Sequence, residues 1–173
     1  MESEHLILRA PEPADVELLY RWENDRETWT YSNTNQPFSR FDLEQYVLNA
    51  EKDIVSQKQA RFMIDRKKDG VQQTIGNIDL FEYDPVHARA GVGVFIAAES
   101  REQKLASEAL ELIISYAFEV LNLHQLFCNI AADNRISIKL FENFNFVLAG
   151  KKRDWIRKNN NWQDQLMYQL INK

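Results

Sequence analysis

Two basic side chains, Arg101 and Lys104, stand where a predicted strand over residues 88–97 runs into a predicted helix. A helix N-terminus attracts anions through its free N–H groups and its dipole, so cations there oppose the dipole by up to about 1 kcal/mol. Their position is easier to understand if a polyanion lies between them. A capping box formed by Ser100 and Gln103 would instead satisfy the same N–H groups internally, and the spacing leaves both interpretations open.

Asp79 and Glu82 are acidic side chains on the neighbouring strand, which is expected over residues 73–83. Side chains alternate along a strand, so these two are expected on opposite faces, and at most one points into a cleft beside the 88–97 strand. Glu82 is preferred as a candidate general base and Glu23 is a further candidate, with a solvated surface charge as the alternative for each. The sequence shows no spacing of side chains that is typical of a metal site.

The hydrophobic periodicity predicts the element order βααβββαβαββ. Strands are expected at residues 6–9, 60–65, 73–83, 88–97, 126–131, 146–155 and 162–171, and helices at 15–22, 39–53, 105–118 and 134–144. Asp69-Gly70 and residues 158–161 are typical of turns, and Asn145 is expected to take a left-handed conformation after a helix.

Length and composition set the broad class of the protein. A chain of 173 residues with 45% hydrophobic residues is expected to form one domain, residues 1–173, with a full core. A net charge of −5 disfavours general binding of nucleic acid. One cysteine, an N-terminus unlike a signal peptide and the lack of a long apolar run favour a cytoplasmic protein without a membrane span.

The region from Ala88 to Phe146 resembles the acyl-CoA-binding core of the GNAT family of N-acetyltransferases. The family's turn, Gln/Arg-x-x-Gly-x-Gly/Ala, corresponds to Arg-Glu-Gln-Lys-Leu-Ala at 101–106, and its second signature to 134–146. Within the family the chain is most similar to the branch of ribosomal-protein N-terminal (alanine/serine) acetyltransferases and spermidine acetyltransferases, through 8–10, 75–80 and 121–124. The resemblance implies an α/β (α+β) GNAT fold, with a central mixed, mostly antiparallel twisted sheet of about seven strands and about four flanking helices.

The resemblance implies that an amine attacks acetyl-CoA directly, with acetyl-CoA as cosubstrate and no metal. In the family, a backbone N–H on a bulged strand binds the thioester oxygen, a turn cradles the pyrophosphate, and a following helix contacts the rest of the cofactor. The implied cofactor-binding residues are Val94, Phe95, Ile96, Arg101, Glu102, Gln103, Lys104, Leu105, Ala106, Ser107, Asn134, Ser137, Lys139 and Phe141. Asn134 is also expected as the N-cap of its helix.

Two positions depart from the family pattern. Lys104 replaces the first glycine of the turn, where a side chain could crowd the pyrophosphate or offer it an ammonium group. Phe141 replaces a tyrosine whose hydroxyl lies near the leaving sulfur in many relatives, so this chain's proton donor is unassigned. Both departures leave open an alternative function, a catalytically impaired acyl-CoA-binding module.

Trp22, Glu23, Trp29 and Tyr31 are candidate acceptor-site residues, with simple packing as the alternative for the aromatic ones. Spermidine enzymes of the resembling branch hold the polyamine with glutamates between their first two helices, whereas residues 32–37 contain no acid here. The lack of acids disfavours a polyamine as the acceptor, so a protein N-terminus or a small amine is favoured. A homodimer is expected by analogy with the family.

Overall fold

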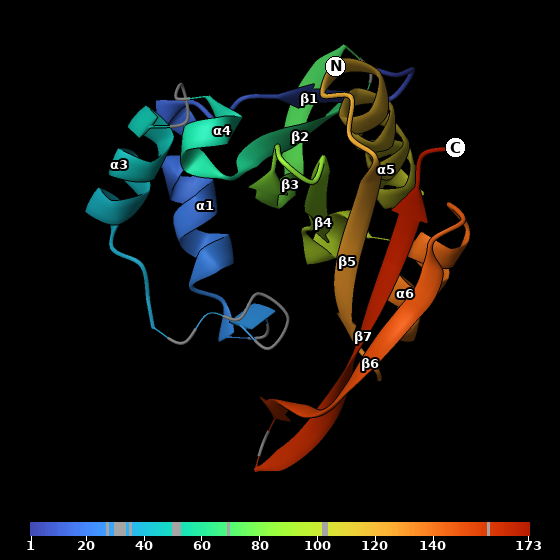
Figure 1. Ribbon diagram of the computed structural model, residues 1–173. Coiled ribbons are helices and arrows are strands. Elements are labelled where there is room, and N and C mark those ends of the chain that lie inside the picture. Colours follow the sequence, from blue (N-terminus) through green and yellow to red (C-terminus); the bar gives the residue numbers. More distant parts are fainter. Residues whose placement is uncertain are drawn as a thin grey trace.

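Seven strands form one sheet in the order β1-β2-β3-β4-β5-β7-β6 (Figure 1). The computed structural model describes residues 1–26, 28–29, 34, 36–49, 53–68, 70–101, 104–158 and 160–173. The strands are β1 Leu6–Arg9, β2 Ala60–Lys68, β3 Val71–Asp84, β4 Arg89–Ile96, β5 Gln125–Ala131, β6 Val147–Lys158 and β7 Asn161–Ile171. All neighbours pair antiparallel except β4 and β5. The predicted mixed, mostly antiparallel sheet of seven strands is confirmed.

Five α-helices lie in the described part of the chain, against about four expected. They are α1 Val16–Glu23, α3 Arg40–Asn49, α4 Ile54–Gln57, α5 Leu105–Ser115 and α6 Arg135–Glu142. The helix predicted over 39–53 is wrong at its C-terminal end, because α3 ends at Asn49 and Asp53 starts a new helix by accepting hydrogen bonds from the N–H groups of Val55 and Ser56. Past Ser115, α5 continues as a π-helical turn, Tyr116–Val120.

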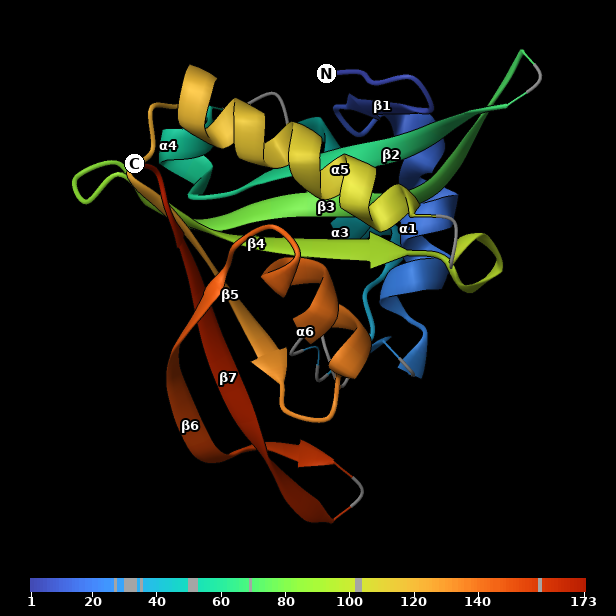
Figure 2. The same cartoon turned by 90° about the vertical axis from the view of Figure 1, so that its right-hand side faces the viewer.

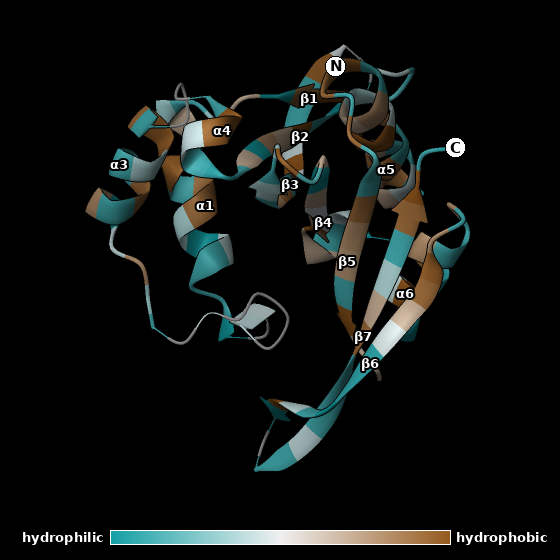
Figure 3. Ribbon diagram, in the orientation of Figure 1, coloured by the Kyte–Doolittle hydropathy of each residue, from teal (hydrophilic) through white to brown (hydrophobic). Residues whose placement is uncertain are grey.

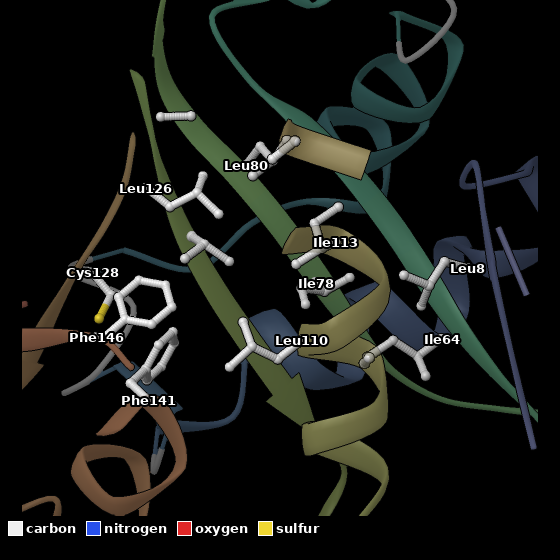
Figure 4. Close-up of a cluster of buried hydrophobic side chains, with 14 of the residues drawn as sticks. Leu8, Ile64, Ile78, Leu80, Leu110, Ile113, Leu126, Cys128, Phe141 and Phe146 are labelled. Atoms are coloured by element: carbon white, nitrogen blue, oxygen red, sulfur yellow. The ribbon is translucent and has the colours of Figure 1, made fainter. Parts of the chain in front are cut away.

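The helices cover both faces of the sheet: α5 lies on one face and α1 and α3 on the other (Figure 2). Because side chains alternate along a strand, Ile78, Leu80 and Val92 pack against α5, while Met63 packs against α1 and α3. Apolar residues occur in both the helices and the strands (Figure 3), and Figure 4 shows the larger cluster of buried ones. The buried residues of α5 are Leu105, Ala109, Leu110 and Ile113.

The strands β4 and β5 separate soon after they meet. Their parallel pairing is limited to residues 89–91 of β4 and 125–127 of β5. β4 continues to Ile96 and β5 to Ala131, and Figure 2 shows the two strands running apart. We call the unpaired parts, residues 92–96 of β4 and 128–131 of β5, the β4–β5 divergence. It leaves one edge of β4 without a neighbouring strand in the middle of the sheet.

Candidate functional site

The N-terminus of α5 adjoins the open end of β4, and no side chain of the described residues is recorded as capping it. Lys104 is its N-cap residue, in the left-handed conformation with φ 59° and ψ 6°, and its side chain makes no capping hydrogen bond. The alternative capping box is wrong in the structure, since Ser100 belongs to a 3-10 helix that ends four residues earlier. Gln103 and Glu102 lie outside the described residues. The first N–H groups of α5 can therefore bind an anion, as at other helix N-termini.

Arg101 and Lys104 flank this helix end differently. Nε of Arg101 donates a hydrogen bond to the carbonyl oxygen of Ile96 at 3.1 Å, which fixes the arginine at the end of β4. The side chain of Lys104 is exposed. Its left-handed backbone explains why glycine suits this position, because a side chain costs about 1–2 kcal/mol in that conformation.

A surface cavity of about 400 Å³ adjoins the same helix end. Ser107, Glu108 and Glu111 line it from α5, Lys104 lines it from the position before α5, Phe144 lines it from the segment after α6, and residues 3–5 line it from the N-terminus. The cavity thus links the start of α5 to the end of α6.

The open edge of β4 presents backbone N–H groups to the β4–β5 divergence. Ala97 N–H donates to the carbonyl oxygen of Ile75 at 2.8 Å, so odd-numbered residues of β4 bond to β3. The N–H groups of Val94 and Ile96 consequently point away from β3, while that of Phe95 points toward it. The expected bulge is not here: the β3–β4 register is regular at these residues and shifts only between Phe81 and Asp84.

The α6 residues have structural partners. Oδ1 of Asn134 accepts the N–H of Ser137 at 3.1 Å, so the predicted N-cap is confirmed, and Lys139 is exposed. Phe141 is only 3% exposed and packs edge-on against Phe146, with ring centroids 5.0 Å apart (Figure 4). Its phenyl ring offers no proton to a leaving group.

Three of the four candidate acceptor residues come together on the α1 face. The Trp22 ring lies 5.3 Å from that of Phe95 on β4, and Nε1 of Trp29 donates to the carbonyl oxygen of Glu23 at 2.7 Å. Tyr31 lies outside the described residues. The contact between Trp22 and Phe95 places the end of α1 beside the β4–β5 divergence.

Asp79 and Glu23 share one arginine that the sequence analysis did not single out. Arg61 on β2 donates to both oxygens of Asp79, at 2.8 and 2.9 Å, and its third nitrogen donates to Glu23. Burial lowers the pKa of Arg61, but the two carboxylates raise it well above the usual value, so the guanidinium stays charged. Burial also raises the pKa of the nearby Tyr46 to about 12, which keeps that phenol protonated.

Glu82 lies elsewhere. It is exposed and left-handed, with φ 49°, within the β3–β4 irregularity that interrupts strand alternation. It lies beyond the Phe81–Gly91 pair, where β4 and β5 are still joined, roughly 17 Å along the strand from Ile96. The irregularity interrupts the alternation on which the opposite-face expectation for Asp79 and Glu82 rested, and the structure does not bring Glu82 to the β4–β5 divergence.

Cys128 is 2% exposed in the core, and burial raises the pKa of its thiol to about 12, so it is not a nucleophile. In the ranges given above for the structure, no three His, Cys, Asp or Glu side chains are placed to hold a metal ion. Within the same ranges, no helix is long and apolar enough to cross a membrane.

The comparisons with known proteins agree on one family. A family model described as an acetyltransferase (GNAT) domain matches residues 5–147. The chain is 28% identical over 172 residues to spermidine N(1)-acetyltransferase of Vibrio cholerae, covering 99% of this chain and 96% of that protein. A shorter match, 32% identical over 98 residues, covers 57% of this chain and 54% of a Bacillus subtilis protein provisionally named a ribosomal N-acetyltransferase.

A solved structure of the Vibrio cholerae spermidine N-acetyltransferase, in complex with CoA and spermine, has the same fold. Its TM-score is 0.87 at 24% identity, with 98% of this chain and 96% of that chain covered. A dodecameric structure of the spermidine N-acetyltransferase from the same organism gives a TM-score of 0.81 at 25% identity, covering 98% and 95%.

Proposed function

The chain belongs to the GNAT acetyltransferase family and is an N-acetyltransferase, and from that premise we propose that it transfers acetyl from acetyl-CoA to a small primary amine. The observation that carries the proposal is the uncapped N-terminus of α5 at the end of the open β4 edge. The N-terminus of α5 suits a pyrophosphate, and the open edge of β4 suits a chain of amide groups. One extended cosubstrate that carries both groups can contact both features.

In this proposal, acetyl-CoA is held by residues at the start of α5 and along the open edge of β4. The N–H groups of Leu105 and Ala106, with Arg101 and Lys104, bind the pyrophosphate by charge-assisted hydrogen bonds. Ile96, the nearer of the two to α5, offers its N–H group to the pantetheine, and Val94 offers its N–H group to the thioester oxygen without the need for a bulge.

Bound acetyl-CoA would supply a thioester. The amine nitrogen bonds to its carbonyl carbon while the C–S bond breaks, the sulfur leaves as thiolate, and the nitrogen loses its proton to water. The chain's own residues position the reactants, which supplies much of the rate. Phe141 cannot protonate the sulfur, but a thiolate with a pKa near ~8.5 is a tolerable leaving group at neutral pH. No step of this proposal uses a metal.

For the acceptor, a polyamine stands first because a relative that this chain matches over 96% of its length is named spermidine N(1)-acetyltransferase. The carboxylates absent from residues 32–37 are supplied instead by Glu23 and Asp79. A protein N-terminus, favoured by the sequence, is the second candidate, and the partial match to the Bacillus subtilis protein supports it.

We further propose that residues 1–173 act as one domain, because β6 and β7, beyond the matched range, complete the same sheet. Self-association is part of the proposal as well. The β6–β7 hairpin extends from the body (Figure 1) and exposes Trp155 and Trp162, each at 59%. Large exposed aromatic side chains are typical of contact surfaces.

The test is thiol release from acetyl-CoA with a panel of acceptors: spermidine, a monoamine such as butylamine, and a peptide with a free N-terminus. Release that depends on an amine supports the proposal, and the preferred acceptor identifies the class. Release with the peptide alone would overturn the small-amine acceptor. No release with any acceptor would overturn the enzymatic function.

A further inference from the structure

Asn129 carries a buried polar atom that nothing in the described chain satisfies. It lies on β5 between Cys128 and Ile130, both core residues, and its side-chain oxygen Oδ1 has no hydrogen-bond partner there. Such an unpaired oxygen costs about 1–3 kcal/mol. Packing does not explain this free-energy penalty, since an apolar residue would fill the same position without burying an unpaired oxygen.

The strand register places Asn129 in a row with Asp79. Phe81, Gly91 and Phe127 form one such row, since Phe81 pairs with Gly91, Gly91 pairs with Phe127, and the two rings meet edge-on at 5.8 Å. Two residues farther along, the same face of the sheet carries Asp79 on β3, Gly93 on β4 and Asn129 on β5.

This second row lies where the strands have separated, on the face covered by α1. Asn129 therefore faces Gly93 across the β4–β5 divergence. A Cβ atom added to Gly93 would meet only one atom within 4 Å, a ring carbon of Phe81 at 3.7 Å. The row thus consists of a carboxylate, a residue without a side chain, and an unpaired amide oxygen.

The charge beside the row is negative. Arg61 contributes one positive charge against the two carboxylates of Asp79 and Glu23. The side chains of Arg61, Glu23 and Asp79 are 18%, 16% and 27% exposed, so solvent screens them only in part. In the described chain, the second carboxylate oxygen of Glu23 makes no hydrogen bond.

We propose that the acceptor's reacting amino group binds over Gly93, where it donates an N–H to Oδ1 of Asn129 and is attracted by the net negative charge of Glu23, Asp79 and Arg61. This inference rests on the proposed function. An amine supplies the hydrogen-bond donors that the row of Asp79, Gly93 and Asn129 lacks. The amine nitrogen then lies on the face of the sheet opposite α5, beside the N–H groups of Val92 and Val94 on the open β4 edge. Asn129 is a substrate-positioning residue in this arrangement, and Arg61 fixes the two carboxylates.

Asn129→Leu separates this role from a structural one. Removing an unsatisfied buried oxygen is expected to leave the melting temperature unchanged or to raise it, while kcat/KM for the amine falls about tenfold and acetyl-CoA affinity stays within twofold. Gln163→Leu is the control: it also removes a buried oxygen without a partner, on the projecting hairpin, together with a hydrogen bond from Nε2 to Asp133, and it should leave kcat/KM unchanged. If the larger leucine prevents folding, Asn129→Ala is measured in the same way.

The charge is tested with a second matched pair on α1. Glu23→Gln should raise the KM for the amine about tenfold with a smaller change in kcat. Glu17→Gln, which also removes an α1 carboxylate paired with an arginine, should change neither.

The outcomes distinguish a failure of the Asn129 site from a failure of the proposed function. Unchanged kcat/KM in Asn129→Leu, or a lower melting temperature with full activity, would overturn this inference and leave the proposed function intact. A wild-type protein that releases no thiol with any amine would instead overturn the proposed function itself.

Discussion

Lys104 occupies a conformation that suits glycine, and Lys104→Gly is expected to change stability and cofactor affinity in opposite directions. The left-handed φ of 59° costs a lysine about 1–2 kcal/mol, and glycine returns about 0.5–1 kcal/mol of this through its larger freedom in the unfolded chain. The net gain is about 0.5–1 kcal/mol, or about 1–4 °C in melting temperature for a chain of this length.

The affinity for acetyl-CoA should fall in the same variant, because the exposed ammonium group of Lys104 is lost from the α5 N-terminus. A solvent-exposed charge pair contributes up to about 1 kcal/mol, so we expect binding about three- to fivefold weaker at low salt. Thermal unfolding and calorimetric titration with acetyl-CoA measure the two effects separately.

Two controls isolate the causes. Lys58→Gly changes another exposed, left-handed lysine, at the end of α4, and should stabilise the protein without affecting acetyl-CoA. Lys104→Gln should weaken binding without stabilising the fold. Tighter binding by Lys104→Gly would refute the reasoning, because it would show that the side chain crowds the pyrophosphate rather than binding it.

Three further predictions concern other parts of the molecule. Phe141→Tyr should raise the rate of the acetyl-transfer step in rapid-quench measurements if position 141 lies beside the sulfur. Burying the new hydroxyl should lower stability by about 1–3 kcal/mol. An unchanged rate would show that position 141 does not act on the sulfur. Arg61→Leu leaves two adjacent carboxylates without their partner and should lower the free energy of unfolding in urea by about 3–5 kcal/mol, whereas a loss below 1 kcal/mol would contradict the pairing. Hydrogen bonds from the N–H and side chain of His87 lower the pKa of Asp84 to about 2, so its stabilising effect is complete above the unfolded value and disappears as the pH falls from about 4 to 2. NMR titration of Asp84 measures this value, and a midpoint near 4 would show that the turn does not hold the carboxylate.

Local patterns in the sequence predicted the strands and turns well. Asn145, Asn160 and Gly70 have positive φ at positions where turn residues indicated it. Cys128 and Phe141 are buried, as expected of apolar residues within periodic segments, although the resemblance also assigned Phe141 to the site. Each of these features depends on a few neighbouring residues, so the sequence contains it directly.

The site was harder to predict because it depends on pairing between distant strands. Arg61 reaches Asp79, 18 residues away, and Glu23, 38 residues away, only through the β2–β3 register and the position of α1. Asn129 carried one local signal, a polar residue within the apolar run Leu126–Ala131. Glu82 was misplaced because an irregularity between Phe81 and Asp84 breaks the alternation on which the expectation rested.

The most direct test of the central claim is calorimetric titration of the wild-type protein with acetyl-CoA, followed by spermidine in the same cell with thiol detection. We expect binding in the micromolar range and thiol release that begins only when the amine is added. No binding at millimolar acetyl-CoA would contradict the account, because the α5 N-terminus and the open edge of β4 would then not form a cofactor site.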